Sequence, residues 1–212
     1  MSGEVSTEPT RRRLTPRQAD TVRRLTDAAV EEVRDTGYEG LTVRNVARRA
    51  GVAPATAYTY FASKNHLITE VFWRRLSALP PVEPAEPAEL VEPAGPGADR
   101  DAAGRVERVL REIALLVSDE PELAAACTTA MLGTDPDVRE LRARIGAAIR
   151  TRLRDALGDH DDPAVLGALE LAYSGALLHA GMGYTSYTRM ADRLAEMARL
   201  ILPAAAGRPG GR

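Results

Sequence analysis

Residues 41–64 read LTVRNVARRAGVAPATAYTYFASK and form the most specific pattern in this chain of 212 residues. Thr42 stands directly before apolar residues at helical spacing, where a threonine side chain can cap the first turn of a helix. Gly51 suits the end of that helix, and Pro54 suits the first turn of the next one. The core face of the first helix would be formed by Val43, Val46, Ala47 and Ala50. We therefore expect two short helices joined by a glycine turn.

The second helix of this pair is expected to carry small side chains on its outer face. At about 100° per residue, its inward face would be formed by Pro54, Ala57, Tyr58 and Phe61. Its outward face would be formed by Ala55, Thr56 and Thr59. Such short side chains let a helix lie deep in the major groove of DNA, where threonines bond base edges or contact a thymine methyl. Tyr58 and Tyr60 flank this face and could reach phosphates, so the pattern favours sequence-specific DNA binding.

Side chains on either side of this second helix could add contacts to DNA. Arg44, in the first turn of the first helix, could reach a phosphate or a guanine edge, whereas Arg48 and Arg49 could equally form a solvated face. Ser63 is placed to cap a further helix, whose free N–H groups could bind a phosphate. Lys64, the only lysine, lies in the first turn of that helix, where a cation opposes the helix dipole. Because nothing local explains Lys64, we interpret it as a phosphate contact.

Helical periodicity continues on both sides of this pair. Residues 17–36 carry apolar positions at helical spacing, and Gly37 is the expected stop: the positions are Val22, Leu25, Ala29 and Val33. After Ser63 an apolar stripe follows, formed by Leu67, Ile68, Val71, Phe72, Leu76 and Leu79. The pattern over residues 17–77 therefore predicts a three-helix domain that contains a helix-turn-helix at 42–61.

Three segments are expected to lie outside the packed domains. Residues 1–16 look like a flexible basic arm, whose Arg11, Arg12 and Arg13 could enter a minor groove or belong to a disordered tail. Residues 80–100 form a linker and mark the domain boundary, since their prolines disfavour helix and central strand. A proline-rich partner motif is the alternative for this segment. Residues 204–212 are expected to be a disordered tail.

A second helical domain is expected over 101–203. Its helices would cover 103–118, 121–132, 136–157, 163–183 and 187–202. The fold class is therefore all-α, with about nine helices. Residues 163–183 carry small side chains on several faces, so with 187–202 they could form a four-helix bundle across a two-fold axis. Ordinary packing within the chain is the alternative.

Composition separates the two ends of the chain. The net charge is −2, but residues 11–76 hold 13 Lys and Arg against 7 Asp and Glu, while residues 77–212 hold 15 against 21. A basic end on an acidic body is typical of contact with a polyanion, although chance partition is the alternative. Cys127 is the single cysteine, and no apolar leader or run of 18 apolar residues is evident. We therefore expect a cytoplasmic protein with no membrane contact.

Enzyme motifs are missing from the sequence. The three histidines lie in none of the common metal, nucleophile or nucleotide motifs, so we expect no enzyme, no cofactor and no metal. His160 lies among Asp159, Asp161 and Asp162, which could suggest a metal site but are more typical of a charged turn. A non-specific architectural DNA-binding protein is a further alternative, against which the acidic body argues.

Taken together, these motifs resemble the DNA-binding head of the TetR family of bacterial regulators. The matching residues are Gly37-Tyr38, Thr42-Val-Arg44, Ala50-Gly51-Val52, Thr56-Ala-Tyr58-Thr-Tyr60-Phe61 and Ser63-Lys64. The resemblance spans 17–77 and implies a homodimer on a palindromic operator, with a ligand whose binding releases DNA. It implies repression as the usual outcome and leaves activation open. The expected DNA contacts are Thr42, Arg44, Pro54, Ala55, Thr56, Tyr58, Thr59, Tyr60 and Lys64.

Two positions depart from that family's pattern. Ala53 stands where a capping residue is frequent, and Ala57 stands where Leu or Ile is usual.

The C-terminal body of the chain loosely resembles repressors of sterol and fatty-acid catabolism. This resemblance implies a hydrophobic effector such as a lipid or an acyl-CoA. The candidate pocket residues, for which core packing is the alternative, are Leu116, Cys127, Met131, Tyr173, Leu177, His179 and Met182.

Overall fold

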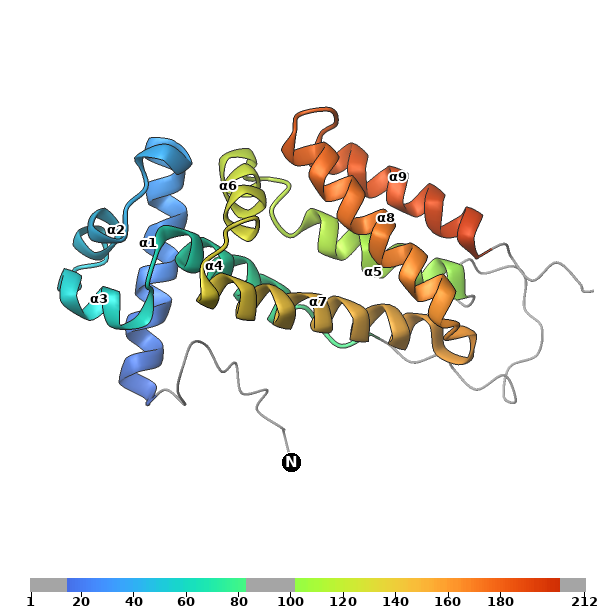
Figure 1. Ribbon diagram of the computed structural model, residues 1–212, viewed down its shortest axis with the longest axis horizontal. Coiled ribbons are helices and arrows are strands. Elements are labelled where there is room, and N and C mark those ends of the chain that lie inside the picture. The colour runs from blue at the N-terminus through green and yellow to red at the C-terminus, as the bar shows by residue number, and fades with distance from the viewer. Residues whose placement is uncertain (1–14, 83–101, 203–212) are drawn as a thin grey trace, which may run out of the picture. The chain divides into compact units, whose positions relative to one another are not determined.

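The computed structural model describes residues 15–82 and 102–202, and this part of the chain is all-α with no strand, as the sequence predicted (Figure 1). Its helices are α1 (Pro16–Gly40), α2 (Val43–Arg49), α3 (Pro54–Tyr60), α4 (Lys64–Ser77), α5 (Ala102–Leu115), α6 (Pro121–Met131), α7 (Pro136–Leu157), α8 (Pro163–Gly181) and α9 (Tyr187–Ile201). A short 3₁₀ turn, Gly158–His160, follows α7. The expected arm and tail, and most of the expected proline-rich linker, lie outside the described residues.

Helix ends follow local chemistry that is visible in the sequence. The Thr42 hydroxyl accepts a hydrogen bond from the Asn45 amide at 3.0 Å, and the Ser63 hydroxyl accepts one from the His66 amide at 3.1 Å. Both predicted N-caps are therefore confirmed. Gly37 has a φ of +66° and interrupts the helical geometry of α1, as expected for the stop. A short further helical segment follows this kink and brings the printed end of α1 to Gly40.

The chain divides into two compact units, and one of the three breaks between them, after Leu79, falls at the start of the expected proline-rich linker. The first unit comprises 1–79 with 116–146, and the second comprises 80–115 with 147–212. In the first unit, α6 packs on α1 and α4 through its buried alanines and Leu123 (Figure 1). The expected division into domains 17–77 and 101–203 therefore differs from these units, since α6 and the start of α7 belong with the N-terminal helices.

The second unit is built around α9. The helices α5 and α8 both pack on α9, whose buried face is Met190, Ala191, Leu194, Ala195 and Ala198 (Figure 1). Ion pairs join its elements: Arg152 contacts Glu112 at 3.0 Å, and Arg199 contacts Glu107 at 2.6 Å. The buried apolar face of α9 and these ion pairs thus hold together helices that are distant in the sequence.

A buried carboxyl group lies in the core of the first unit. Glu70 of α4 is fully buried, and its Oε1 accepts a hydrogen bond from Arg74 Nε at 2.9 Å. Its Oε2 has no hydrogen-bond partner among the described residues. Burial raises the pKa of Glu70 to about 7, against the opposing charges of Arg74 and Arg144. Near neutral pH, part of the folded protein therefore holds Glu70 as a neutral acid.

Replacing Glu70 by glutamine should make stability less dependent on pH. The stabilising contribution of the raised pKa is complete below the unfolded value of about 4.5 and is lost as the pH rises through about 7. The melting temperature of Glu70→Gln minus that of the wild type should therefore increase between about pH 5 and about pH 8, by the equivalent of up to about 3 kcal/mol. Thermal unfolding followed by circular dichroism measures this difference.

The matched control is Glu122→Gln, which changes an exposed glutamate of the same unit. A difference in melting temperature that stays constant over this pH range for Glu70→Gln would show that Glu70 does not titrate near neutrality.

Candidate nucleic-acid interface

The short helix α3 has one buried strip and a broad exposed face. Ala57 is fully buried, as is Phe61 directly after the helix, whereas Ala55, Thr56 and Thr59 are all exposed. The predicted outward face is therefore confirmed. The predicted inward face is too wide, since Pro54 is exposed and Tyr58 is 52% exposed. The buried strip of this two-turn helix is therefore narrower than the periodicity suggested, because Ala57 is its only buried residue among Pro54–Tyr60.

The hydroxyl of Thr59 is oriented by its own helix. Thr59 Oγ1 donates a hydrogen bond to the Thr56 carbonyl oxygen at 2.6 Å. Because the proton is engaged, the hydroxyl presents an acceptor and the methyl group to the outside. This side chain can therefore accept a hydrogen bond from an adenine or cytosine amino group, or contact a thymine methyl. Tyr60, expected to flank the face, is half-buried at its edge.

The turn between α2 and α3 is held by an arginine that the sequence analysis missed. Arg24 of α1 donates from Nη2 to the carbonyl oxygens of Ala50 and Gly51, the latter at 3.3 Å. Gly51 has a φ of +63°, and a Cβ added there would lie 3.2 Å from Arg24 Nη2. The glycine therefore serves both the left-handed backbone and the close approach of Arg24. No local pattern around Arg24 signals this contact, which spans 26 residues.

Two adjacent arginines at the end of α2 have different environments. Arg49 donates to Glu32 at 2.8 Å and to Asp35 at 2.6 Å, both on α1. Its hydrogen bonds to Asp35 and Glu32 raise the pKa of Arg49. Arg48 is exposed and has only a long contact of 3.4 Å, with Asn45. For these two arginines the sequence left open a contact to DNA or a solvated helix face. The structure separates them, because Arg49 holds α2 on α1, whereas Arg48 lies at the surface.

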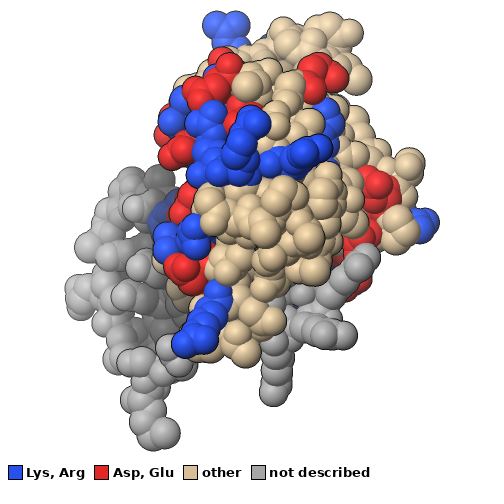
Figure 2. All heavy atoms as spheres, turned by 90° about the vertical axis from the view of Figure 1, so that its left-hand side faces the viewer, with Lys and Arg blue, Asp and Glu red and all other residues tan. Residues whose placement is uncertain are grey.

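Arg44 and Arg48 lie on α2, the helix that packs against α3. Both are exposed on α2, and neither forms an ion pair with any described residue. Figure 2 views the side of the protein where Figure 1 places α1, α2 and α3, and shows a broad uncharged area with Lys and Arg side chains along part of its edge and Asp and Glu side chains along other parts. Small uncharged side chains on α3 and exposed arginines on the neighbouring α2 suit a helix that inserts into a groove between phosphates.

Lys64 has a local explanation that the sequence analysis did not foresee. Its Nζ donates to the Tyr38 carbonyl oxygen at 2.9 Å and lies 4.2 Å from the centroid of the Tyr38 ring. The argument that nothing local accounts for this cation is therefore wrong. A phosphate contact by Lys64 stays a prediction, and it now concerns an ammonium group that Tyr38 already orients.

The seven candidate pocket residues are divided between the two compact units. Leu116, Cys127 and Met131 belong to the first unit, and Tyr173, Leu177, His179 and Met182 belong to the second. Cys127 is buried against the Ile68 carbonyl, and burial raises the pKa of its thiol to about 12. Its environment is thus that of an inert core thiol. By contrast, Met182 is 63% exposed.

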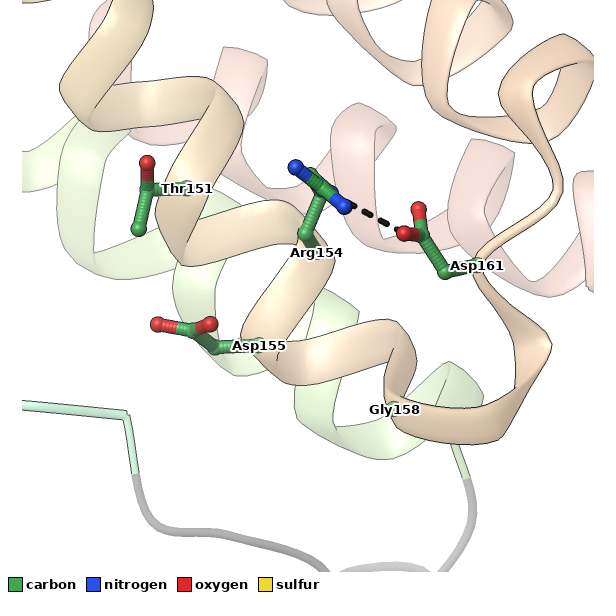
Figure 3. A pocket seen from close by; sticks show the side chains of 5 residues that line it. All are labelled: Thr151, Arg154, Asp155, Gly158 and Asp161. Atoms are coloured by element: carbon green, nitrogen blue, oxygen red, sulfur yellow. Dashed lines mark hydrogen bonds and ion pairs between the residues drawn. The ribbon is translucent and has the colours of Figure 1, made fainter.

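A pocket in the described part of the second unit has a different character from the one expected. It measures about 410 Å³ and is lined by Thr151, Arg154, Asp155, Gly158 and Asp161, none of them a predicted pocket residue. In Figure 3, Arg154 points toward Asp161, and the two form an ion pair of 2.9 Å. All five lining residues are exposed, so this hollow does not suit a hydrophobic ligand.

The turn after α7 carries the acidic residues that the sequence analysis weighed as a metal site. His160 closes the 3₁₀ turn, Asp161 pairs with Arg154, and the Asp162 carboxylate accepts from the Ala164 amide at 2.8 Å as the N-cap of α8. Within residues 15–82 and 102–202, no group of three or more His, Cys, Asp or Glu side chains could hold a metal ion.

The fold and the exposed α3 define a helix-turn-helix protein, and comparison with known proteins identifies its family. Residues 25–71 match the family model described as bacterial regulatory proteins, tetR family. The chain is 46% identical over 191 residues to an uncharacterized HTH-type transcriptional regulator of Mycobacterium tuberculosis, covering 89% of this chain and 84% of that protein. The chain belongs to the TetR family of transcriptional regulators and is not an enzyme.

More distant relatives agree with this assignment. The chain is 28% identical to the HTH-type transcriptional repressor KstR of Rhodococcus jostii, covering 91% of this chain and 87% of KstR. A TetR regulator structure from Rhodococcus sp. RHA1 is similar with a TM-score of 0.66 and 22% identity, covering 87% and 98% of the two chains. The structure of FadR from Bacillus subtilis in complex with stearoyl-CoA is similar with a TM-score of 0.57 and 18% identity, covering 83% of this chain and 96% of FadR. At these identities the two structures show the fold alone.

Exchange of Arg49 and of Arg48 for alanine should separate their roles. Arg49→Ala should lower the melting temperature by several degrees, because it leaves the buried Glu32 carboxylate without its partner. Arg48→Ala is the matched control and should leave the melting temperature within about a degree. Differential scanning calorimetry of both variants tests this. Equal melting temperatures for the two variants would contradict a holding role for Arg49.

Proposed function

We propose that this regulator binds a palindromic DNA operator as a homodimer, with α3 of each copy in the major groove. The observation that carries the proposal is the exposed face formed by Ala55, Thr56 and Thr59 on α3, together with the exposed Arg44 and Arg48 of α2, the helix that packs against α3. Short side chains let the α3 backbone approach base edges closely, and the two arginines would contact the phosphates that flank the groove.

Contacts to the DNA backbone would fix the register of α3. Pro54 and Tyr58 are exposed beside the reading face, and Tyr60 and Lys64 are half-buried at its border. Thr42 is exposed, but its hydroxyl caps α2, so its own contact to DNA would involve its remaining acceptor capacity. In this arrangement the threonines of α3 read bases, and the flanking side chains position the helix.

The second copy would pack on α8. Leu171, Leu178 and Met182 lie on one stripe of this helix, and Leu171 is 76% exposed. A Cβ added at Gly175 would meet nothing within 4 Å, so packing within the chain does not require a glycine there. An exposed apolar stripe with an unneeded glycine favours close approach by another helix. This supports dimerisation through 163–183 and 187–202.

The same helix could be taken for a membrane span. Among the described helices, α8 is long and apolar enough by length and composition to cross a membrane. Glu170, near its middle, forms a two-point pair with Arg150 of α7 at 2.7 and 2.6 Å. A charge pair to its own unit ties α8 to the protein and favours a helix–helix interface in a cytoplasmic regulator.

We also propose that a hydrophobic effector, such as a lipid or an acyl-CoA, releases the protein from DNA. Support comes from the similarity of fold to FadR, solved with stearoyl-CoA, and from the sequence similarity to the repressor KstR. The mode of control that this favours is repression, with activation as the alternative. Melting temperatures with and without stearoyl-CoA test this part, since a ligand of the folded state raises them.

Thr59 offers the sharpest test of base reading. Thr59→Ala should weaken binding to an operator, obtained by selecting bound fragments from the source genome, by about 1–3 kcal/mol. Binding to random-sequence duplex should change little, because random DNA offers no matched base for this side chain. Fluorescence anisotropy with both duplexes measures the two affinities, and an equal loss on both would contradict base reading.

Thr59→Val distinguishes the two groups that Thr59 presents. Valine keeps the branched shape and a methyl group but lacks the hydroxyl, so it should bind the operator like the wild type if the methyl group reads a thymine. It should bind like Thr59→Ala if the hydroxyl accepts a hydrogen bond from a base.

Sedimentation should find a dimer at micromolar concentration without DNA. Leu171→Glu should shift the protein to monomer, because a carboxylate would be buried in the apolar interface. The matched control is Leu132→Glu, at a leucine in the first unit that is 64% exposed, and it should stay dimeric. A strictly monomeric wild type would contradict the assignment of α8 to a dimer interface.

A further inference from the structure

Asn65 joins the DNA-facing corner of the first unit to the loop between α6 and α7. Its Oδ1 accepts a hydrogen bond from the Tyr38 hydroxyl, and its Nδ2 donates to Asp135 Oδ2 at 3.2 Å. Tyr38 in turn holds Lys64 through its carbonyl oxygen and its ring. A continuous chain of contacts therefore runs from Asp135 through Asn65 and Tyr38 to Lys64, entirely within one compact unit.

The loop at the far end of this chain is shaped to meet Asn65. A Cβ added at Gly133 would lie 2.9 Å from Asn65 Nδ2, so a larger residue there would push the loop away. Arg142 of α7 donates to the carbonyl oxygens of Met131 at 2.5 Å and Gly133 at 3.3 Å. The glycine and the arginine together keep Asp135 within reach of Asn65.

The oxygen and the nitrogen of the Asn65 amide have different hydrogen-bonding roles, since Oδ1 accepts and Nδ2 donates. The amide group can donate from Nδ2 to a carboxylate and accept at Oδ1 from a phenol at the same time. Burial is the main cause that raises the pKa of the Tyr38 phenol, with Glu39 and Asp135 adding to it. A protonated phenol is the form that can donate to Asn65.

We propose that Asn65 is a positioning residue for DNA binding: it couples the docked α6–α7 loop at Asp135 to the orientation of Lys64 through Tyr38. This rests on the proposed function, in which Lys64 contacts a phosphate. When the loop is docked, Asn65 holds the Tyr38 ring, and the ring and carbonyl hold the Lys64 ammonium. When the loop moves, Asn65 loses its anchor and Lys64 loses its orientation. DNA affinity thereby becomes sensitive to a loop that does not touch DNA.

The readout is the salt dependence of binding to a duplex of random sequence, measured by fluorescence anisotropy. Each phosphate contact contributes about 0.9 to the slope of log K against log salt concentration. Lys64→Ala and Asn65→Leu should each reduce the slope of the wild type by about one unit. The double variant should show no further reduction, because both changes remove the same contact.

Asp135 provides a second test, in which simple charge and coupling predict opposite results. Asp135→Ala removes a negative charge, which by itself would strengthen binding to DNA. The coupling predicts weaker binding and the same reduced slope, because the anchor of Asn65 is gone. Asp135→Asn should rescue both, since its amide oxygen still accepts from Asn65 Nδ2. The matched control is Arg34→Ala, which removes a 3.0 Å contact with Glu120 at the opposite end of α6 and should leave the slope unchanged.

The outcomes separate this inference from the proposed function. If the wild type shows no salt-dependent binding, DNA binding itself fails. If Lys64→Ala reduces the slope but Asn65→Leu and Asp135→Ala do not, the coupling is overturned while DNA binding stands. A wild-type slope in Lys64→Ala also overturns it, since Lys64 would then contact no phosphate. Circular dichroism melts of all variants confirm that each is folded at the temperature of measurement.

Discussion

The surface that we propose to face DNA depends on how a helix of only seven residues, α3, is held in place. A helix this short has little stability of its own. Ala57 and Phe61 bury its inner side, and Arg24 of α1 holds the carbonyl oxygens of the preceding turn. All of these restraints act from one side. The opposite side can therefore carry small residues and remain free for DNA while the helix keeps a defined orientation.

The long helix α1 engages one of two adjacent arginines of α2. Its carboxylates at Glu32 and Asp35 pair with Arg49, whereas Arg48 forms no ion pair with any described residue. The helix α6 is then held against the same unit at both ends. At its start, Glu120 pairs with Arg75 at 2.5 Å and with Arg34 at 3.0 Å. After its end, the loop meets Asn65, so a helix from the second half of the sequence becomes part of the first compact unit.

Local patterns predicted the helices and their caps well, because these depend on neighbours in sequence. Thr42 and Ser63 cap as expected, and the outward face of α3 follows from the periodicity of a helix. The same reasoning placed Tyr58 in the interior, where it is not, because periodicity says which residues share a face and not how wide the buried strip is. The same reasoning also missed the contacts of Arg24, Tyr38 and Asn65, because their partners lie at least 26 residues away in the sequence.

From the linear chain alone, one could derive an all-α protein with a helix-turn-helix whose second helix exposes Ala55, Thr56 and Thr59. Helical period, capping and glycine turns act over a few residues and are written into neighbouring positions. Only the packed chain decided that Lys64 lies on Tyr38, that Arg49 pairs with carboxylates of α1 while Arg48 forms no ion pair with any described residue, and that α6 belongs with the first helices. The physical reason is that burial and ion pairing depend on groups brought together from distant parts of the chain, and no local pattern records which of them will meet.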